Sequence, residues 1–131
     1  MAGNRVVARY RDGRMVKGST ADFLPTKEMF HVAPEAGGAP VAVQIRELKA
    51  VFFVRDLAGH PEHRKTNDFD PAKPPIGRKI RVTFFDGEVL VGTTQGYQPG
   101  RPGFFLVPAD PASNTERCYV VGAATPDVAL L

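Results

Sequence analysis

Residues 5–18 read RVVARYRDGRMVKG, and residues 79–92 read KIRVTFFDGEVLVG. In both stretches apolar and polar residues alternate, reach an Asp-Gly pair and continue to a glycine. Alternation with a period of two is typical of a β-strand that buries one face. An Asp-Gly pair between two such runs predicts a hairpin, because a tight two-residue turn needs positive φ angles. Each stretch is therefore expected to form two antiparallel strands.

The two hairpins belong to a longer internal repeat. Shifting the sequence by 74 positions aligns residues 9–34 with residues 83–108, and seven of the 26 pairs are identical. Matched glycines carry the most weight because they serve special backbone geometry. We expect Gly18 and its counterpart Gly92 to lie at sharp strand bends, where a side chain would distort the sheet.

Each repeat is expected to contain five short strands. After the hairpin, the remaining strands are predicted at 29–33, 41–45 and 50–54, and at 104–107, 117–121 and 128–131. Strong helical periodicity is absent, and residues 47–49 would form one helical turn at most. Short bent strands in this number are typical of a small SH3-like barrel. The sequence thus predicts an all-β protein built from two such barrels in tandem.

Residues 56–77 separate the two repeats. They contain four prolines and two glycines, which block regular hydrogen bonding and are typical of a linker. The predicted division is a first barrel over 1–55, a linker over 56–77 and a second barrel over 78–131. Phe69 is a candidate for pinning the linker to one of the barrels.

Composition indicates a soluble globular protein of 131 residues, with 43% hydrophobic and 24% charged residues. No apolar run approaches the roughly 20 residues that span a bilayer, so no membrane contact is expected. The first residues lack the apolar stretch of a signal peptide. The single cysteine, Cys118, excludes an intrachain disulfide and favours a reducing cytoplasm.

Basic residues concentrate in the first hairpin, although the net charge of the chain is only +3. Arg5, Arg9, Arg11 and Lys17 are candidates for phosphate binding, because a basic strand attracts anions. The alternative is a solvated strand face that arginines keep soluble. Arg5 and Arg9 also match the Arg-x-x-x-Arg half of the PilZ pattern for cyclic dinucleotides, whose second half is missing from the sequence.

Residues 6–18 resemble the first motif of Sm-like proteins, and residues 45–47, Ile-Arg-Glu, resemble the Ile-Arg-Gly of the second motif. This resemblance implies single-stranded RNA binding, with Arg46 as an RNA contact. Leu24 and Glu28 stand where that family has the Asp and Asn that help to bind uridine-rich RNA. The implied fold is therefore better supported than the implied activity.

Residues 49–56 and 102–111 are similar to an uncharacterised group of small bacterial proteins. This second resemblance implies a bacterial cytoplasmic origin and no assigned chemistry.

Catalytic and metal-binding patterns find little support. His60 and His63 lie three residues apart, but zinc needs three or four ligands and the chain has one thiol. A pair of Cys118 with His31 is conceivable, yet a lone cysteine in a strand behaves as a small hydrophobe. Phosphate-loop, dinucleotide and Gly-x-Ser-x-Gly patterns do not occur in the sequence. We expect no metal, no cofactor and no enzymatic activity.

Residues 98–105, QPGRPGFF, form the most distinctive candidate binding loop, with Arg101 at the tip of a stiff turn. Adjacent phenylalanines in a strand point to opposite faces. Phe105 is therefore either exposed for a partner or buried between the two barrels, and residues 52–53 pose the same alternative. The leading interpretation is a non-enzymatic binding or adaptor module for a protein partner. Single-stranded RNA binding is the alternative, and cyclic-dinucleotide binding is a further one.

Overall fold

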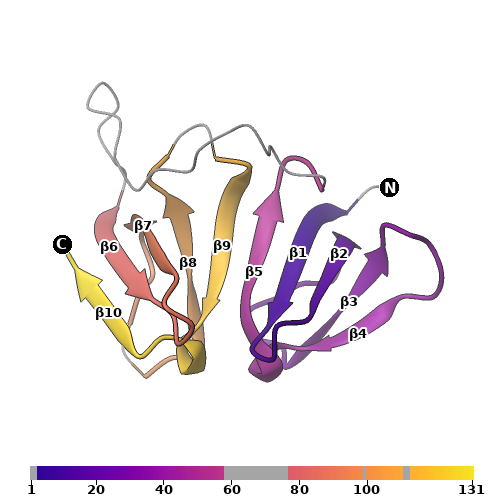
Figure 1. Ribbon diagram of the computed structural model, residues 1–131, viewed down its shortest axis with the longest axis horizontal. Helices are drawn as coiled ribbons and strands as arrows, with labels where there is room; N and C mark the ends of the chain where they lie inside the picture. Colours follow the sequence, from indigo (N-terminus) through magenta and orange to yellow (C-terminus); the bar gives the residue numbers. More distant parts are fainter. Residues whose placement is uncertain (1–2, 58–76, 99, 111–112) are drawn as a thin grey trace.

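The computed structural model describes residues 3–57, 77–98, 100–110 and 113–131. These residues form ten strands and two single-turn 3₁₀ helices (Figure 1). The elements of the first half are β1 (Asn4–Tyr10), β2 (Met15–Thr20), β3 (Met29–Pro34), β4 (Val41–Gln44), η1 (Ile45–Glu47) and β5 (Leu48–Val54). The elements of the second half are β6 (Arg78–Thr83), β7 (Val89–Thr94), β8 (Gly103–Pro108), β9 (Thr115–Val121), η2 (Gly122–Ala124) and β10 (Asp127–Leu130). The all-β prediction is confirmed.

The described strands form one continuous antiparallel sheet in the order β10-β6-β7-β8-β9-β5-β1-β2-β3-β4. The prediction of two SH3-like barrels in tandem is therefore not confirmed, because this sheet is open. The halves share it through β5 and β9, which pair antiparallel with Val51 opposite Tyr119. The predicted linker falls almost wholly outside the described residues, as do Phe69, His60 and His63.

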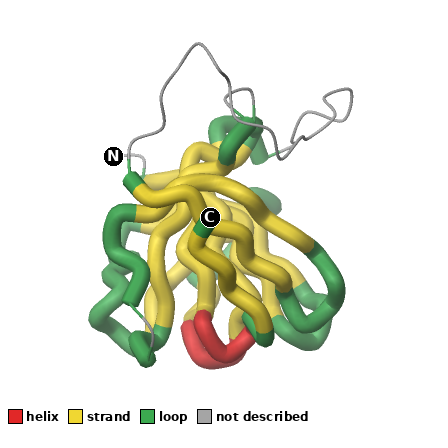
Figure 2. Tube along the Cα trace, turned by 90° about the vertical axis from the view of Figure 1, so that its left-hand side faces the viewer, coloured by secondary structure: helices red, strands yellow, loops and turns green. Residues whose placement is uncertain are grey.

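The internal repeat is visible in the topology. The first half has the strand order β5-β1-β2-β3-β4, and the second half has the matching order β10-β6-β7-β8-β9. Each half ends its fourth strand in a 3₁₀ turn, and both turns lie at the same end of the molecule (Figure 2). Residues 45–47 and 122–124 are thus equivalent, which aligns Arg46 with Ala123.

The two Asp-Gly turns are longer than the expected two-residue turn. The Gly13 N–H donates to the Tyr10 carbonyl, and the Tyr10 N–H donates to the Arg14 carbonyl. Three residues therefore separate Tyr10 from Arg14, and the last of them, Gly13, has a φ of 95°. This pattern is a turn followed by a glycine in the left-handed region, which is the usual three-residue hairpin loop. Gly87 repeats it with a φ of 91°.

Two hydrophobic cores lie on either side of the joint between the halves. The first core gathers apolar side chains of β1, β3, β4 and β5 together with Tyr119 and Val121 of β9. The second gathers those of β6 to β9 together with Ala50, Phe52 and Val54 of β5. All seven residues of β5 are buried, because its alternate side chains enter different cores. This places Phe52 and Phe53 between the halves, as one of the two alternatives predicted.

The glycines Gly18 and Gly92 are required by the close approach of a neighbouring strand. A Cβ atom on Gly18 would overlap the Ala33 carbonyl oxygen, and one on Gly92 would overlap the Val107 carbonyl oxygen. The expected distortion by a side chain is thus explained by the close backbone approach of β3 to β2 and of β8 to β7, which are antiparallel neighbours.

Candidate functional site

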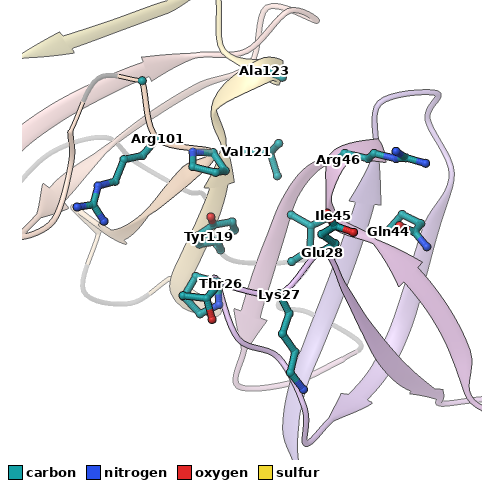
Figure 3. Close-up of a pocket in the computed structure, with 13 residues that line it drawn as sticks. Thr26, Lys27, Glu28, Gln44, Ile45, Arg46, Arg101, Tyr119, Val121 and Ala123 are labelled. Carbon is teal, nitrogen blue, oxygen red and sulfur yellow. The ribbon is translucent and has the colours of Figure 1, made fainter.

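A cavity of about 520 Å³ opens between the two halves beside the β5–β9 joint (Figure 3). This junction groove is lined by residues from both halves: Pro25, Thr26, Lys27, Glu28, Gln44, Ile45, Arg46, Gly100, Arg101, Pro102, Tyr119, Val121 and Ala123. Its volume lies within the range of about 300–1,000 Å³ that is usual for ligand pockets. Arg46 and Arg101, which the sequence singles out for unrelated reasons, line opposite sides of this groove.

The inner wall of the junction groove is apolar. Tyr119 and Val121 are alternate residues of β9, so both point toward the first half, and Ile45 of η1 lies across from them (Figure 3). All three side chains are less than a tenth exposed. Burial raises the pKa of the Tyr119 hydroxyl above its ordinary value, so the ring is neutral at physiological pH. The wall therefore suits an apolar group.

The rim of the junction groove is mainly basic. Lys27, Arg46 and Arg101 are exposed, and Glu28 is the acidic residue among its lining side chains. The Arg46 and Arg101 side chains extend away from the cavity in opposite directions (Figure 3). The Arg101 Nε donates to Gln98 Oε1 at 2.7 Å, which holds this guanidinium beside its own loop. The rim thus places positive charge around an apolar centre.

The loop that forms one side of the groove is fastened by Asp22. One carboxylate oxygen accepts hydrogen bonds from the His31 N–H at 2.9 Å and from the Thr20 hydroxyl at 3.1 Å. The other lies 2.8 Å from His31 Nδ1. Hydrogen bonds from the His31 backbone and ring lower the pKa of Asp22 to about 2. The loop from residue 21 to residue 28 is therefore tied to β3 before it reaches the groove.

Phe105 lies inside the joint. Its ring packs against Phe53, Phe23 and Tyr119 at centroid distances of 6.1, 6.2 and 5.2 Å. The Arg117 guanidinium covers this aromatic group, 4.3 Å from the Phe53 centroid and 5.0 Å from the Phe105 centroid. The structure therefore places Phe105 at the interface between the halves.

The basic residues of the first hairpin lie apart from the groove lining. Arg5 Nη1 donates to the Arg55 carbonyl at 2.9 Å, and Lys17 Nζ donates to the Leu57 carbonyl at 3.3 Å. Both side chains thereby fasten the chain where it leaves β5. Arg9 is exposed on the same strand face as Arg5, as alternation requires.

Arg11 is the residue of the hairpin that connects to the groove. Its Nη2 donates to the Arg46 carbonyl at 2.7 Å, and its N–H donates to the Glu47 carbonyl at 3.0 Å. Arg11 therefore supports the 3₁₀ turn that carries Ile45 and Arg46 to the groove.

Other candidate chemistry is not assembled in the part of the chain that the structure describes. Cys118 is fully buried in the second core, whereas His31 is exposed on β3 and paired with Asp22. No group of three or more His, Cys, Asp or Glu side chains clusters as metal ligands within the described ranges. The described residues also contain no helix that is long and apolar enough to cross a membrane.

Tyr119 and Val121 were missed as groove residues by the sequence analysis. They belong to an apolar run that reads as an ordinary core strand. The internal repeat contains a signal for this surface. Val43 pairs with Phe30 in the first half, and Val120 pairs with Phe104 in the second, so Val43 and Val120 are equivalent. The preceding residues, Ala42 and Tyr119, are then also equivalent, and Ala42 is exposed. A large aromatic residue in one repeat and a small exposed residue at the equivalent position of the other indicate that this strand face is buried in the second half and exposed in the first.

A model of a family of unknown function, DUF6982, matches residues 2–131. The chain belongs to this family. The DUF6982 match spans both halves and the segment between them, so the two repeats occur together as one family unit. No curated protein and no solved structure matches the chain.

Proposed function

We propose that the chain is a non-enzymatic binding module, and that its junction groove takes a short apolar segment of a protein partner flanked by acidic residues. The observation that carries this proposal is the combination of an apolar wall with a basic rim in one cavity. Tyr119, Val121 and Ile45 supply the wall, and Arg46 and Arg101 stand on opposite sides of the rim.

The wall and the rim contribute differently to binding. Burying one large apolar side chain is worth about 1.5–3 kcal/mol, whereas an exposed ion pair is worth about 0–1 kcal/mol. The apolar contact therefore supplies most of the affinity. The rim supplies the preference for acidic flanking residues and speeds their approach, as charged surfaces do in protein recognition.

A displayed library of random short peptides tests the proposal. We expect selection on the wild-type protein to enrich peptides with a large apolar residue next to Asp or Glu. The variant Ala123→Trp fills the groove from an exposed position and should lose these peptides, whereas Ala36→Trp, at an exposed position outside the groove lining, should keep them. Failure to enrich any motif, or equal binding by Ala123→Trp, would contradict the proposal.

Single-stranded RNA is the second candidate ligand, and the rim favours it. Lys27, Arg46 and Arg101 line the groove, and Arg11 holds the turn that carries Arg46. The resemblance to Sm-like proteins supports the same reading. The discriminating measurement is fluorescence anisotropy with a short mixed-sequence RNA at low and near-physiological salt. Phosphate contacts release counterions, so RNA binding should weaken steeply as salt rises. Peptide binding should weaken much less, because its apolar contact supplies most of the affinity and salt screens only the rim.

A further inference from the structure

Two strands of the described sheet have a single strand neighbour. They are β4 at one end and β10 at the other. Edge strands are usually protected by charges, prolines or bulges, because their free N–H and carbonyl groups can pair with another chain. The residues on the two edges therefore show which pairing the protein allows.

The outward groups of β10 can be assigned from its pairing with β6. The Leu131 N–H donates to the Lys79 carbonyl at 2.9 Å, so residue 131 faces β6. Backbone groups alternate sides along an antiparallel strand. Val128 and Leu130 therefore direct their N–H and carbonyl groups away from the sheet.

Pairing of β10 with β4 of another copy would repeat the joint that already exists inside the chain. In that joint Val51 and Phe53 of β5 face Tyr119 and Arg117 of β9. Phe53 lies opposite Val6, as Leu130 lies opposite Ile80, so Val128 and Leu130 are the counterparts of Val51 and Phe53.

Prolines obstruct this head-to-tail pairing. Matching Val43 with Val120 makes Ala42 and Pro40 the counterparts of Tyr119 and Arg117. Pro40 has no N–H to donate to a carbonyl at the position of Leu130. At the other end of the same pairing, Pro126, which directly precedes β10, is the counterpart of Lys49, and its nitrogen likewise has no N–H to donate. Only the contact between Val128 and Ala42 would keep both backbone hydrogen bonds.

We propose that β10 instead pairs antiparallel with β10 of a second copy of this chain, about a two-fold axis at Ala129. Val128 would exchange both backbone hydrogen bonds with the partner's Leu130, and symmetry would repeat this exchange with Leu130 and the partner's Val128. Pro126 lies outside this register. The result is a single sheet that continues through both copies.

The chemistry of the edge supports a second copy as its occupant. The side chains of residues 128–131 are all apolar, none of these residues is proline, and Leu130 and Leu131 are 40% and 62% exposed. The small side chain of Ala129 allows two identical strands to approach on the axis. The face that carries Ala129 also carries Asp127 of β10 and the basic residues Lys79 and Arg81 of β6. In the dimer, Asp127 of each copy would therefore lie between the basic residues of the two β6 strands.

Sedimentation of the full chain over a wide concentration range tests the proposal. We expect the wild type to reach twice its mass of 14.2 kDa. Leu130→Lys places a charge on the edge and should sediment as a monomer. Val107→Lys is the matched control, since Val107 is an apolar residue 52% exposed on β8, and it should remain dimeric. Circular dichroism melting of each variant shows whether it is folded.

Ala42→Lys separates the two modes of pairing. It should leave the dimer intact, because β4 takes no part in it. A wild type that stays monomeric at the highest concentration would overturn the proposal. So would assemblies that Ala42→Lys dissolves, or a dimer that survives Leu130→Lys in folded protein.

Discussion

Lys49 Nζ lies 2.7 Å from Asp86 Oδ2 and thereby joins β5 of the first half to the β6–β7 turn of the second. Glu88 accepts a further hydrogen bond from the same ammonium, which also lies 4.7 Å from the centroid of the Phe84 ring. The Lys49 side chain is only 7% exposed, whereas both carboxylates keep contact with water. A buried cation that reaches out to two acids is the polar part of the joint, and it complements the aromatic group around Phe105.

Replacing Lys49 with methionine should weaken the joint. Methionine preserves the packing of the alkyl chain but removes the hydrogen bonds to Asp86 and Glu88. Hydrogen bonds that involve charged groups contribute about 1.5–3 kcal/mol, so we expect the free energy of unfolding in urea to fall by about this amount. Arg14→Met is the control, because Arg14 pairs with Asp12 in the equivalent turn but at the surface. An equal loss in both variants would show that burial of Lys49 is irrelevant.

The same ion pair should shape the dependence of stability on pH. Burial lowers the pKa of Lys49, but its hydrogen bonds to Asp86 and Glu88 outweigh burial and raise this pKa above its ordinary value of 10.5. The hydrogen bond from Lys49 lowers the pKa of Asp86 below 3.8. Stability from Lys49 is present below pH 10.5 and is lost as pH rises through the folded pKa. Stability from Asp86 is present above pH 3.8 and is lost as pH falls through the folded pKa.

Urea unfolding at a series of pH values measures both losses. Burial also raises the pKa of Tyr10 and Tyr119, so their ionisation adds to the loss of stability at high pH. The comparison that isolates Lys49 is therefore wild type against Lys49→Met. We expect the difference between the two proteins to be largest near neutral pH and to shrink toward both extremes. A constant difference at all pH values would contradict the role given to the ion pair.

Gly92 should tolerate no side chain. A Cβ atom there would overlap the Val107 carbonyl oxygen and touch the Leu106 side chain, so β7 and β8 would have to separate. We expect Gly92→Ala to lower the free energy of unfolding by about 2–3 kcal/mol, as backbone defects of this kind do. Gly96→Ala is the control, since a Cβ atom on Gly96 meets nothing within 4 Å. Equal melting temperatures for Gly92→Ala and the wild type would remove the crowding argument.

The sequence was sufficient for the strands but not for their joint. Alternation and the matched glycines predicted both hairpins, because these features depend on local geometry and on contacts within one repeat. The sharing of β5 between the cores depends on contacts far apart in the sequence. The one sign of this sharing in the sequence is the apolar run at residues 50–54. There the alternation of apolar and polar residues stops, because both faces of the strand are buried. That signal is consistent with a central strand but does not identify the neighbour.

The groove was predictable only in pieces. Arg46 and Arg101 were selected from a resemblance and from a stiff loop, and no pattern in the sequence indicated that they flank one cavity. Their place on opposite sides of one groove follows from the pairing of β5 with β9, which aligns the ends of the two halves. The first-hairpin residues Arg5 and Lys17 were selected for their charge, yet both donate to carbonyls of residues after β5. Charge is readable from sequence, whereas the acceptor of each hydrogen bond depends on the assembled sheet.

Arg117 should stabilise the aromatic side of the joint. Its guanidinium lies within 5.0 Å of the centroids of both Phe53 and Phe105, one from each half. A cation–π contact made by an exposed guanidinium contributes about 0.5–1 kcal/mol, so Arg117→Ala should lower the free energy of unfolding in urea by about 1 kcal/mol. Arg117→Lys should lower the free energy of unfolding by less than Arg117→Ala, because lysine retains the positive charge. It should still fall below the wild type, because lysine lacks the planar group that stacks on the rings. Arg9→Ala is the control, since its guanidinium lies 5.9 Å from the Phe52 ring and should contribute less. A larger loss for Arg9→Ala than for Arg117→Ala would show that the joint does not depend on this stacking.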